Sequence, residues 1–388
     1  MSDKKVLVLL SNRLESFVNA YLLQKQGFDV IGLSFIIASK ENAQLIDSDC
    51  NLGEIQAIKN TCDQLKIPFY VSDISDRFKE NIVENYLSNR LHLISPPICN
   101  LCVKLRIQVL FEKMKELKAD HISTGHYCKV QKNLQSSNFY IHCGVDRDND
   151  QSHLLSGLAN TFLEKLILPL GDLKKEEVLE IAKRAGIKIN SNTLEKCFKN
   201  SKTLEGLVNR HIPKSLLKEG IFVKGRSEEV VGNFENQTKY MIGQQLNTNV
   251  GNMDKGQYII GHKASKREII VGTIEDLYAD SVFVDKLEST PLFNSRKNFI
   301  AYAKSESLDQ RIKCYIVNKT CNKVVVHFDE KGGPFIIGEK IIFYDKPVEG
   351  GKILGSGIIK SPFKFKKLHR ADRSNDDKEE NTDSSFTF

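Results

Sequence analysis

Near its start the chain reads VLVLLSNRLESFVNAYLLQKQG over residues 6–27. The five apolar residues 6–10 are typical of a strand buried on both faces. The stretch Glu15–Gln26 has the apolar spacing of a helix that ends near Gly27. A buried strand that leads through a short loop into a helix is the repeating unit of a parallel sheet covered by helices. This stretch therefore predicts an α/β fold for the N-terminal part of the chain.

The same alternation continues to about residue 190. Predicted strands occupy Val30–Phe35, Pro68–Val71 and His121–Thr124, and predicted helices occupy Gly53–Leu65, Asp76–Asn89, Cys102–Leu117 and Lys174–Ala185. In parallel sheets of this kind, ligands bind beyond the carboxyl ends of the strands. We therefore expect Ser11–Ser16, the residues from Phe35 onward and Gly125–Tyr127 to surround one crevice.

The pattern changes after about residue 205. Short β-like segments separated by turns follow, at spacings typical of an all-β barrel or sandwich. We expect four parts: an α/β domain over 1–205, a small central α+β domain over 206–290, a C-terminal β-barrel over 291–370 and a disordered acidic tail over 371–388.

Composition excludes some classes of protein. The chain has 388 residues and a formal charge of +7, and it contains no run of 18 apolar residues, so we expect no membrane span. The N-terminus leads directly into a strand, without the features of a signal or transit peptide. Nine cysteines spread over this length do not resemble a disulfide framework, which favours a reducing, cytoplasmic location. The positive charge favours a polyanionic partner.

Six sequence islands carry a resemblance to one family. They are SPPICNLC at 95–102, STGHY at 123–127, DRDNDQS at 146–152, LPLGDLK at 168–174, CF at 197–198 and YMIGQ at 240–244. In this order they are similar to motifs of the bacterial and mitochondrial tRNA-uridine 2-sulfurtransferases, or 2-thiouridylases. The resemblance covers about residues 1–360. It implies a PP-loop fold of the adenine-nucleotide alpha hydrolase type, followed by a central domain and a β-barrel.

The resemblance also implies a reaction. In the family, ATP adenylates the 2-oxygen of the wobble uridine of a tRNA, and a cysteine persulfide then replaces that oxygen with sulfur. The two catalytic cysteines of the family match Cys102 and Cys197 here, with a persulfide sulfur-relay protein as the donor. Cys102 begins a predicted helix, and Cys197 is flanked by lysines, and both surroundings stabilise a thiolate. The alternative for each cysteine is a buried structural thiol.

The segment that should hold ATP departs from the family pattern. The family carries Ser-Gly-Gly-Val-Asp-Ser, whose glycines let backbone amides surround pyrophosphate, whereas this chain has Ser11-Asn12-Arg13-Leu14-Glu15-Ser16. Both glycines are therefore replaced by residues with side chains. The resemblance still implies a nucleotide site at Ser11, Ser16, Phe35 and Gly125.

Cys99 forms a Cys-x-x-Cys pair with Cys102, at a position where family members carry either an acidic residue or a cysteine. With Cys197 the pair could instead hold an iron–sulfur cluster or a zinc ion. A fourth ligand is not evident in the sequence, so we expect no metal.

Two segments are predicted to contact RNA. Gln151 and Ser152 match the family's Asp-Gln-Ser motif and are suited to hydrogen-bond a flipped uridine, although a simple helix cap explains them as well. The basic stretch 364–370 contains Lys366 and Lys367 and includes an aromatic residue, which is typical either of an RNA-backbone contact or of a solvated last strand.

Three functional hypotheses follow. The first is a divergent tRNA 2-thiouridylase that uses ATP. The second is a catalytically inactive relative that binds tRNA, another structured RNA or the ribosome; the altered residues Asn12, Arg13 and Cys99 favour it. The third is a sulfur carrier that works through its cysteines without ATP.

Overall fold

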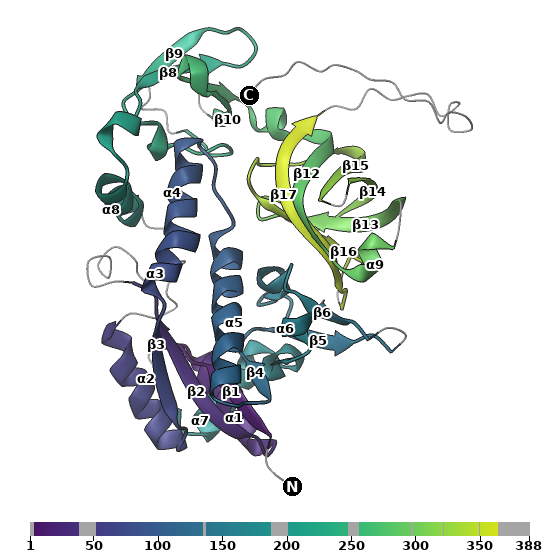
Figure 1. The fold of residues 1–388 in the computed structure, drawn as a ribbon. Coiled ribbons are helices and arrows are strands. Elements are labelled where there is room, and N and C mark those ends of the chain that lie inside the picture. Colours follow the sequence, from purple (N-terminus) through teal and green to yellow (C-terminus); the bar gives the residue numbers. More distant parts are fainter. Residues whose placement is uncertain are drawn as a thin grey trace.

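The computed structural model describes residues 4–38, 52–134, 137–187, 201–246, 256–295, 298–320, 322–348 and 350–363. Within these ranges the chain forms an α/β domain, a small second sheet and a closed β-barrel (Figure 1). The predicted fold class, a parallel-sheet domain followed by a central domain and a barrel, is confirmed.

The N-terminal domain is built on a parallel sheet of five strands in the order β3-β2-β1-β4-β7. The strands are β1 (Lys5–Leu9), β2 (Asp29–Ile36), β3 (Phe69–Asp73), β4 (His121–Ser123) and β7 (Leu166–Ile167). The middle strand, β1, has helices on both of its faces. Val6 and Val8 pack in one apolar core and Leu7 packs in another, because successive side chains of a strand point to opposite faces.

Helices from different parts of the chain cover the two faces. One core joins β1 to α1 (Leu14–Lys25), α2 (Leu52–Leu65) and α7 (Lys175–Arg184) through Phe17, Ile58 and Val178. The other core joins the sheet to α5 (Ile98–Glu116) and to a continuous helix made of α3 (Ser75–Phe78), the π-helical turn η1 (Lys79–Val83) and α4 (Glu84–Leu91).

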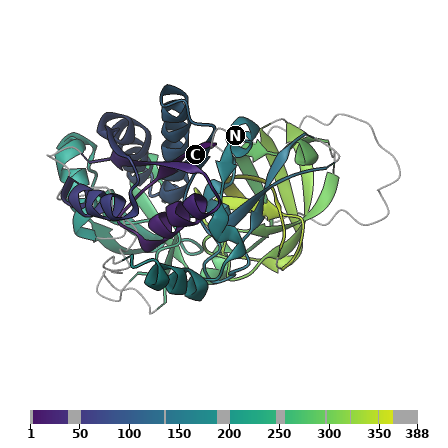
Figure 2. The same ribbon diagram turned by 90° about the horizontal axis from the view of Figure 1, so that it is seen from below.

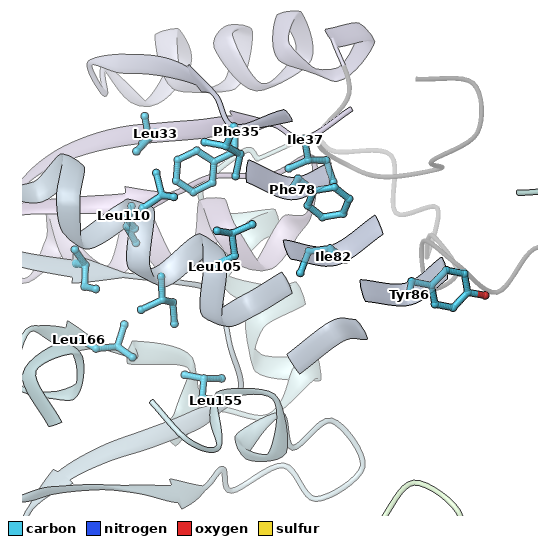
Figure 3. Close-up of a cluster of buried hydrophobic side chains, with 14 of the residues drawn as sticks. Leu33, Phe35, Ile37, Phe78, Ile82, Tyr86, Leu105, Leu110, Leu155 and Leu166 are labelled. Atoms are coloured by element: carbon cyan, nitrogen blue, oxygen red, sulfur yellow. The ribbon is translucent and has the colours of Figure 1, made fainter. Parts of the chain in front are cut away.

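Figure 3 shows the second of these cores. Phe35 of β2 lies beside Phe78 of α3, and Leu105 and Leu110 of α5 belong to the same apolar cluster. Phe35 is fully buried in this apolar cluster. Its ring therefore packs in the protein core, although the sequence assigned it to the nucleotide site.

Helix α5 is longer than the sequence predicts. It begins at Ile98, four residues before the expected start at Cys102, and its N-cap residue is Pro97. The stabilising effect of a helix N-terminus on a thiolate falls off within the first turn. Cys99 lies in that turn and Cys102 lies in the next, so the predicted placement of Cys102 at the start of the helix is wrong.

A hairpin and several short elements complete the domain. They are β5 (Cys128–Lys132), β6 (Phe139–Cys143), η2 (Ser152–Leu155), α6 (Asn160–Leu163) and η3 (Pro169–Asp172). The hairpin β5–β6 lies on the barrel side of the domain in Figure 1. Cys143 N donates to Gly351 O at 3.0 Å, so the hairpin contacts the barrel directly.

The central part is a four-stranded sheet in the order β10-β11-β8-β9. Its elements are α8 (Ser201–His211), η4 (Lys214–Leu216), β8 (Gly220–Lys224), β9 (Val230–Phe234), η5 (Gln237–Lys239), β10 (Tyr258–Lys263), η6 (Ala264–Lys266), β11 (Glu268–Gly272) and η7 (Ile274–Leu277). This sheet meets the end of α4, where fully buried Arg90 donates to the carbonyl oxygen of Thr238.

The C-terminal barrel closes in the order β12-β15-β14-β13-β16-β17. Its elements are β12 (Ala279–Ser289), α9 (Pro291–Asn294), β13 (Asn298–Lys304), β14 (Ile312–Thr320), β15 (Lys323–Gly332), β16 (Lys340–Tyr344) and β17 (Ile353–Phe363). The barrel starts at Ala279, upstream of the expected boundary at 291, because β12 pairs with both β15 and β17. Figure 2 shows the barrel beside the α/β domain, seen from below.

We predict that Phe35→Ala lowers the free energy of unfolding by about 3–5 kcal/mol, because it removes a fully buried ring and leaves a cavity in the core. Denaturant unfolding followed by circular dichroism measures this. Ile300→Ala is the control, because Ile300 is 54% exposed and its truncation should cost less than about 0.5 kcal/mol. Equal stability of Phe35→Ala and the native protein would contradict the assignment of Phe35 to the core.

Candidate active site

The candidate site lies where β1 and β4 end. The two strands pair in parallel, with Val8 opposite Ser123, so the loops that follow them leave the sheet side by side. A Cβ added at Gly125 would lie 2.9 Å from the carbonyl carbon of Glu15 and 3.0 Å from the backbone nitrogen of Ser16. Only glycine allows this approach, so Gly125 fixes the second loop against the first.

Side chains brace the first loop from within. The Ser16 hydroxyl lies 2.9 Å from the carbonyl oxygens of both Ser11 and Arg13, and it accepts from the Ser11 amide at 3.2 Å. Ser16 is 4% exposed. Its side chain therefore holds the loop in shape and is enclosed by it.

The two positions that carry glycine in the resembled family also have structural contacts. The Asn12 side chain donates to the Glu54 carboxylate of α2, and Arg13 has an extended backbone with φ −113° at the start of α1. In the stretch 10–17, all of which the structure describes, no residue has a positive φ. Side-chain hydrogen bonds therefore hold this turn in shape. It lacks the positive-φ backbone conformation in which successive amides surround a phosphate.

The second loop presents a histidine in a cationic setting. His126 Nδ1 lies 2.8 Å from the Thr124 hydroxyl. The pKa of His126 is lowered to about 4, chiefly because partial burial disfavours the protonated imidazole. Electrostatic effects of Arg106, His153 and Arg13 add to this lowering.

These cationic groups come from separate segments. Arg13 precedes α1, Arg106 belongs to α5, and His153 belongs to η2. Each of them lowers the pKa of His126, so all three lie near enough to act on its imidazole. A neutral imidazole surrounded by guanidinium groups is suited to bind an anion such as a phosphate group.

Helix α5 brings the cysteines to the same region. Cys99 and Cys102 are three residues apart, and Arg106 follows Cys102 by four residues, so the three share one face of the helix. Both cysteines have partly exposed side chains. Arg106 on this face lowers the pKa of His126, which indicates that the face is turned toward the loop 124–127, and Cys102 also packs against the apolar core.

Gln151 and Ser152 have mainly structural contacts. Gln151 Oε1 accepts from the backbone amide of Tyr127 at 3.1 Å, and the backbone amide of Gln151 donates to the Tyr127 carbonyl oxygen at 3.1 Å. Ser152 is fully buried and donates to Asp150 Oδ2 at 2.7 Å. Gln151 thus ties the segment before η2 to the loop that carries His126, whereas Ser152 fixes that segment internally through Asp150.

Comparisons with known proteins agree with this architecture. A family model described as "tRNA methyl transferase HUP domain" matches residues 4–199, just over half of the chain. Among curated relatives, the tRNA-specific 2-thiouridylase MnmA 2 of Clostridium botulinum strain Hall is 28% identical over 362 residues, which are 92% of this chain and 99% of the relative. The chain belongs to the tRNA-specific 2-thiouridylase family.

Other relatives align over the same extent. MnmA 2 of Clostridium tetani is 28% identical over 92% of this chain and 98% of its own length, and MnmA of Clostridioides difficile strain 630 is 27% identical over 92% and 98%. A solved structure titled as a predicted subunit of tRNA methyltransferase from Methanocaldococcus jannaschii is 14% identical and covers 47% of this chain and 76% of its own. Its TM-score of 0.29 is too low to carry an argument.

Some predicted site residues of this 2-thiouridylase relative lie outside the described part of the chain. Cys197, Lys366 and Lys367 are among them. Within the described part, no group of three or more His, Cys, Asp and Glu side chains could hold a metal ion. Cys197 lies outside the described residues, so a metal site made of Cys99, Cys102 and Cys197 stays an untested alternative. No helix in the described ranges has the length and apolar character needed to cross a membrane.

The sequence reasoning on this 2-thiouridylase relative missed Arg106 and His153. Each had a local signal: Arg106 follows Cys102 at one helical turn, and His153 comes directly after the Gln151-Ser152 motif. Neither signal shows that the two side chains act on the pKa of His126, because they come from separate segments that only the folded chain brings together.

We predict that His126 makes stability depend on pH between about 4 and 6.5. Its folded pKa lies below its ordinary value, so the unfolded chain binds more protons in this window and stability falls as pH falls through it. His126→Gln should flatten this part of the stability profile, and variation of the exposed His92 by His92→Gln is the control. Denaturant unfolding at a series of pH values is the measurement, and parallel profiles for His126→Gln and the native protein would refute it.

Proposed function

We propose that the protein is a tRNA-uridine 2-sulfurtransferase, which uses ATP and a persulfide donor to thiolate a uridine. The observation that carries the proposal is that the loop 11–16, His126 and the face of α5 that bears Cys99 and Cys102 lie near one another beyond the ends of β1 and β4. Nucleotide chemistry and sulfur chemistry need their groups within reach of the same base, and this arrangement supports that. The curated relatives carry this activity in their names.

The proposed reaction has two stages. The uridine 2-oxygen attacks the α-phosphate of ATP and displaces pyrophosphate, which turns the oxygen into part of an AMP leaving group. The terminal sulfur of a Cys197 persulfide then attacks C2 and AMP departs. The Cys102 thiolate attacks the inner sulfur of Cys197, so the thiouridine is released and a Cys102–Cys197 disulfide remains. A dithiol reductant, delivered with the sulfur-relay protein, restores both thiols.

Arg13 and Arg106 supply the positive charge for the nucleotide. In place of an amide nest, their guanidinium groups would offer side-chain donors to phosphate oxygens. Ser11 and Gly125 would shape the loop beside the phosphates, and Ser16 would act through its hydrogen bonds to Ser11 and Arg13. The two guanidinium groups suit a phosphate by their charge, whereas the backbone of the loop does not offer it a set of convergent amides.

The proposed partners are a tRNA and a sulfur-relay protein in the cytoplasm. Gln151 and the basic residues Lys366 and Lys367 are the proposed RNA contacts, with buried Ser152 acting by holding the segment in place. Adenylation requires the base to leave its stack, and the crevice beyond the strand ends is where it would enter.

A second candidate function is an RNA-binding family member that has lost adenylation. The observation in its favour is the braced loop: the Ser16 hydroxyl is used within the loop, and 10–17 has no residue with positive φ. ATP binding by the native protein separates the two candidates.

We predict that Cys102→Ser abolishes thiolation of tRNA by the purified protein supplied with ATP, magnesium and a persulfide donor. Serine cannot attack the inner sulfur of a persulfide, so product release stops. The control is Cys62→Ala, because Cys62 is fully buried in α2, where burial raises its pKa to about 12. Thiouridine in digested tRNA is quantified by mass spectrometry, and product formation by Cys102→Ser at the native rate would overturn the assigned role.

We predict that the double change Asn12→Gly and Arg13→Gly alters ATP affinity in a direction that identifies the phosphate donors. If Arg13 binds phosphate, its loss weakens binding by about tenfold or more, since charge-assisted hydrogen bonds contribute about 1.5–3 kcal/mol. Calorimetry with native and variant protein measures this. Absence of ATP binding by the native protein, regained in the glycine variant, would refute the ATP-dependent proposal and favour the RNA-binding candidate.

A further inference from the structure

A buried polar cluster joins the barrel to the start of α5. We call it the Lys340 cluster; it consists of Asn100 and Lys104 of α5, Ser156 after η2, Glu288 of β12 and Lys340 of β16. Lys340 Nζ donates to Asn100 Oδ1 at 2.7 Å, to Glu288 Oε2 at 2.7 Å and to the Ser156 carbonyl at 3.2 Å. The Lys340 side chain is 7% exposed. All three donors of a buried ammonium group therefore have acceptors, as burial of a charge requires.

Asn100 is held at both ends of its amide. Its oxygen accepts from Lys340, and its Nδ2 donates to the carbonyl oxygens of Leu154 at 2.8 Å and Ser156 at 3.2 Å. Asn100 is 5% exposed. This residue lies between Cys99 and Cys102 in the first turns of α5, so its contacts fix that part of the helix to the barrel and to the segment that follows His153.

Glu288 closes the cluster from the barrel side. Its carboxylate accepts from both Lys104 and Lys340. At Gly157, where φ is +80°, an added Cβ would lie 2.5 Å from the Glu288 carboxyl carbon and 2.7 Å from Lys104 Nζ. The turn at 156–157 is thus packed directly on the ion pair, and a side chain there would displace it.

Helix geometry divides α5 into two working faces. Asn100 and Lys104 are four residues apart and face the barrel, whereas Cys99, Cys102 and Arg106 share the face toward the crevice. Because a helix is rigid, contacts that hold Asn100 and Lys104 in place also hold the side chains on the other face in place. We propose that Lys340 and Glu288 are positioning residues for Cys102: through Asn100 and Lys104 they fix the turns of α5 that present the thiol to the crevice.

The inference rests on the proposed function only in naming Cys102 as the reacting thiol. Its test uses neither tRNA nor ATP, so failure of the thiolation assay and failure of this inference are separate results. The full-length protein is treated with iodoacetamide at fixed pH, and the alkylation rate of each cysteine is followed on its peptide by mass spectrometry. Cys62, fully buried in another helix, reports global opening in the same sample.

We predict that Lys340→Met accelerates alkylation of Cys102 by about fivefold or more, because the first turns of α5 open locally, while the rate at Cys62 stays unchanged. Glu288→Gln, which keeps the shape of the side chain, should act in the same direction and serves if Lys340→Met does not fold. Val326→Ala is the matched control, since Val326 is fully buried in the barrel core and its truncation destabilises the barrel without touching the cluster.

The double variant Glu288→Gln/Lys340→Met separates positioning from stability. Glu288→Gln alone leaves the two cations Lys104 and Lys340 without their carboxylate, whereas the double variant leaves only Lys104, so resistance to denaturant recovers relative to Glu288→Gln. Alkylation of Cys102 stays fast, because the bonds from Lys340 to Asn100 and Ser156 are still missing. The proposal is overturned if Cys102 reacts at the native rate in the single variants, or if its rate follows stability equally in Val326→Ala and the double variant.

Discussion

The structure depends on the parallel pairing of β1 with β4. Val6, Leu7 and Val8 are fully buried, and their side chains supply both cores of the N-terminal domain. A strand buried on both faces cannot slip in register without exposing apolar groups and losing its ladder of hydrogen bonds. This pairing sets the loop 11–16 beside Gly125, and the missing Cβ at Gly125 lets the two loops touch.

Charge at the resulting crevice is arranged around a histidine that stays neutral. Desolvation and the surrounding cations keep the pKa of His126 low, so at physiological pH the site carries positive charge on its arginines and none on this imidazole. The replacement of loop glycines by Asn12 and Arg13 belongs to the same pattern. The loop has exchanged backbone donors for a side-chain cation, which alters how a phosphate would be held.

The barrel takes part in this arrangement through the Lys340 cluster and through the hairpin β5–β6. Burial lowers the pKa of Lys340 to about 7, and the carboxylate of Glu288 opposes that lowering. Loss of the ammonium proton would leave Asn100 Oδ1 and the Ser156 carbonyl without their charged donor. A cluster of this kind contributes little net stability, because desolvation offsets much of the attraction, but it fixes one geometry. That geometry decides where the cysteines of α5 stand.

The sequence by itself determined the fold class, most element boundaries to within a few residues and the family, because hydrophobic periodicity and short motifs are local signals. It also identified the loop whose glycines are missing. It misplaced the start of α5, since the prolines at 96–97 are compatible with a helix that starts immediately after them as well as with a longer loop. It also placed the start of the barrel at 291, after the end of β12, because the membership of that strand depends on its pairing with β15 and β17. Only the tertiary structure decided that Phe35 belongs to the core, that Arg106 and His153 lower the pKa of His126, and that Lys340 reaches Asn100 across 240 residues of chain. These are contacts between distant segments, and no periodicity within a segment encodes which distant side chain it will meet.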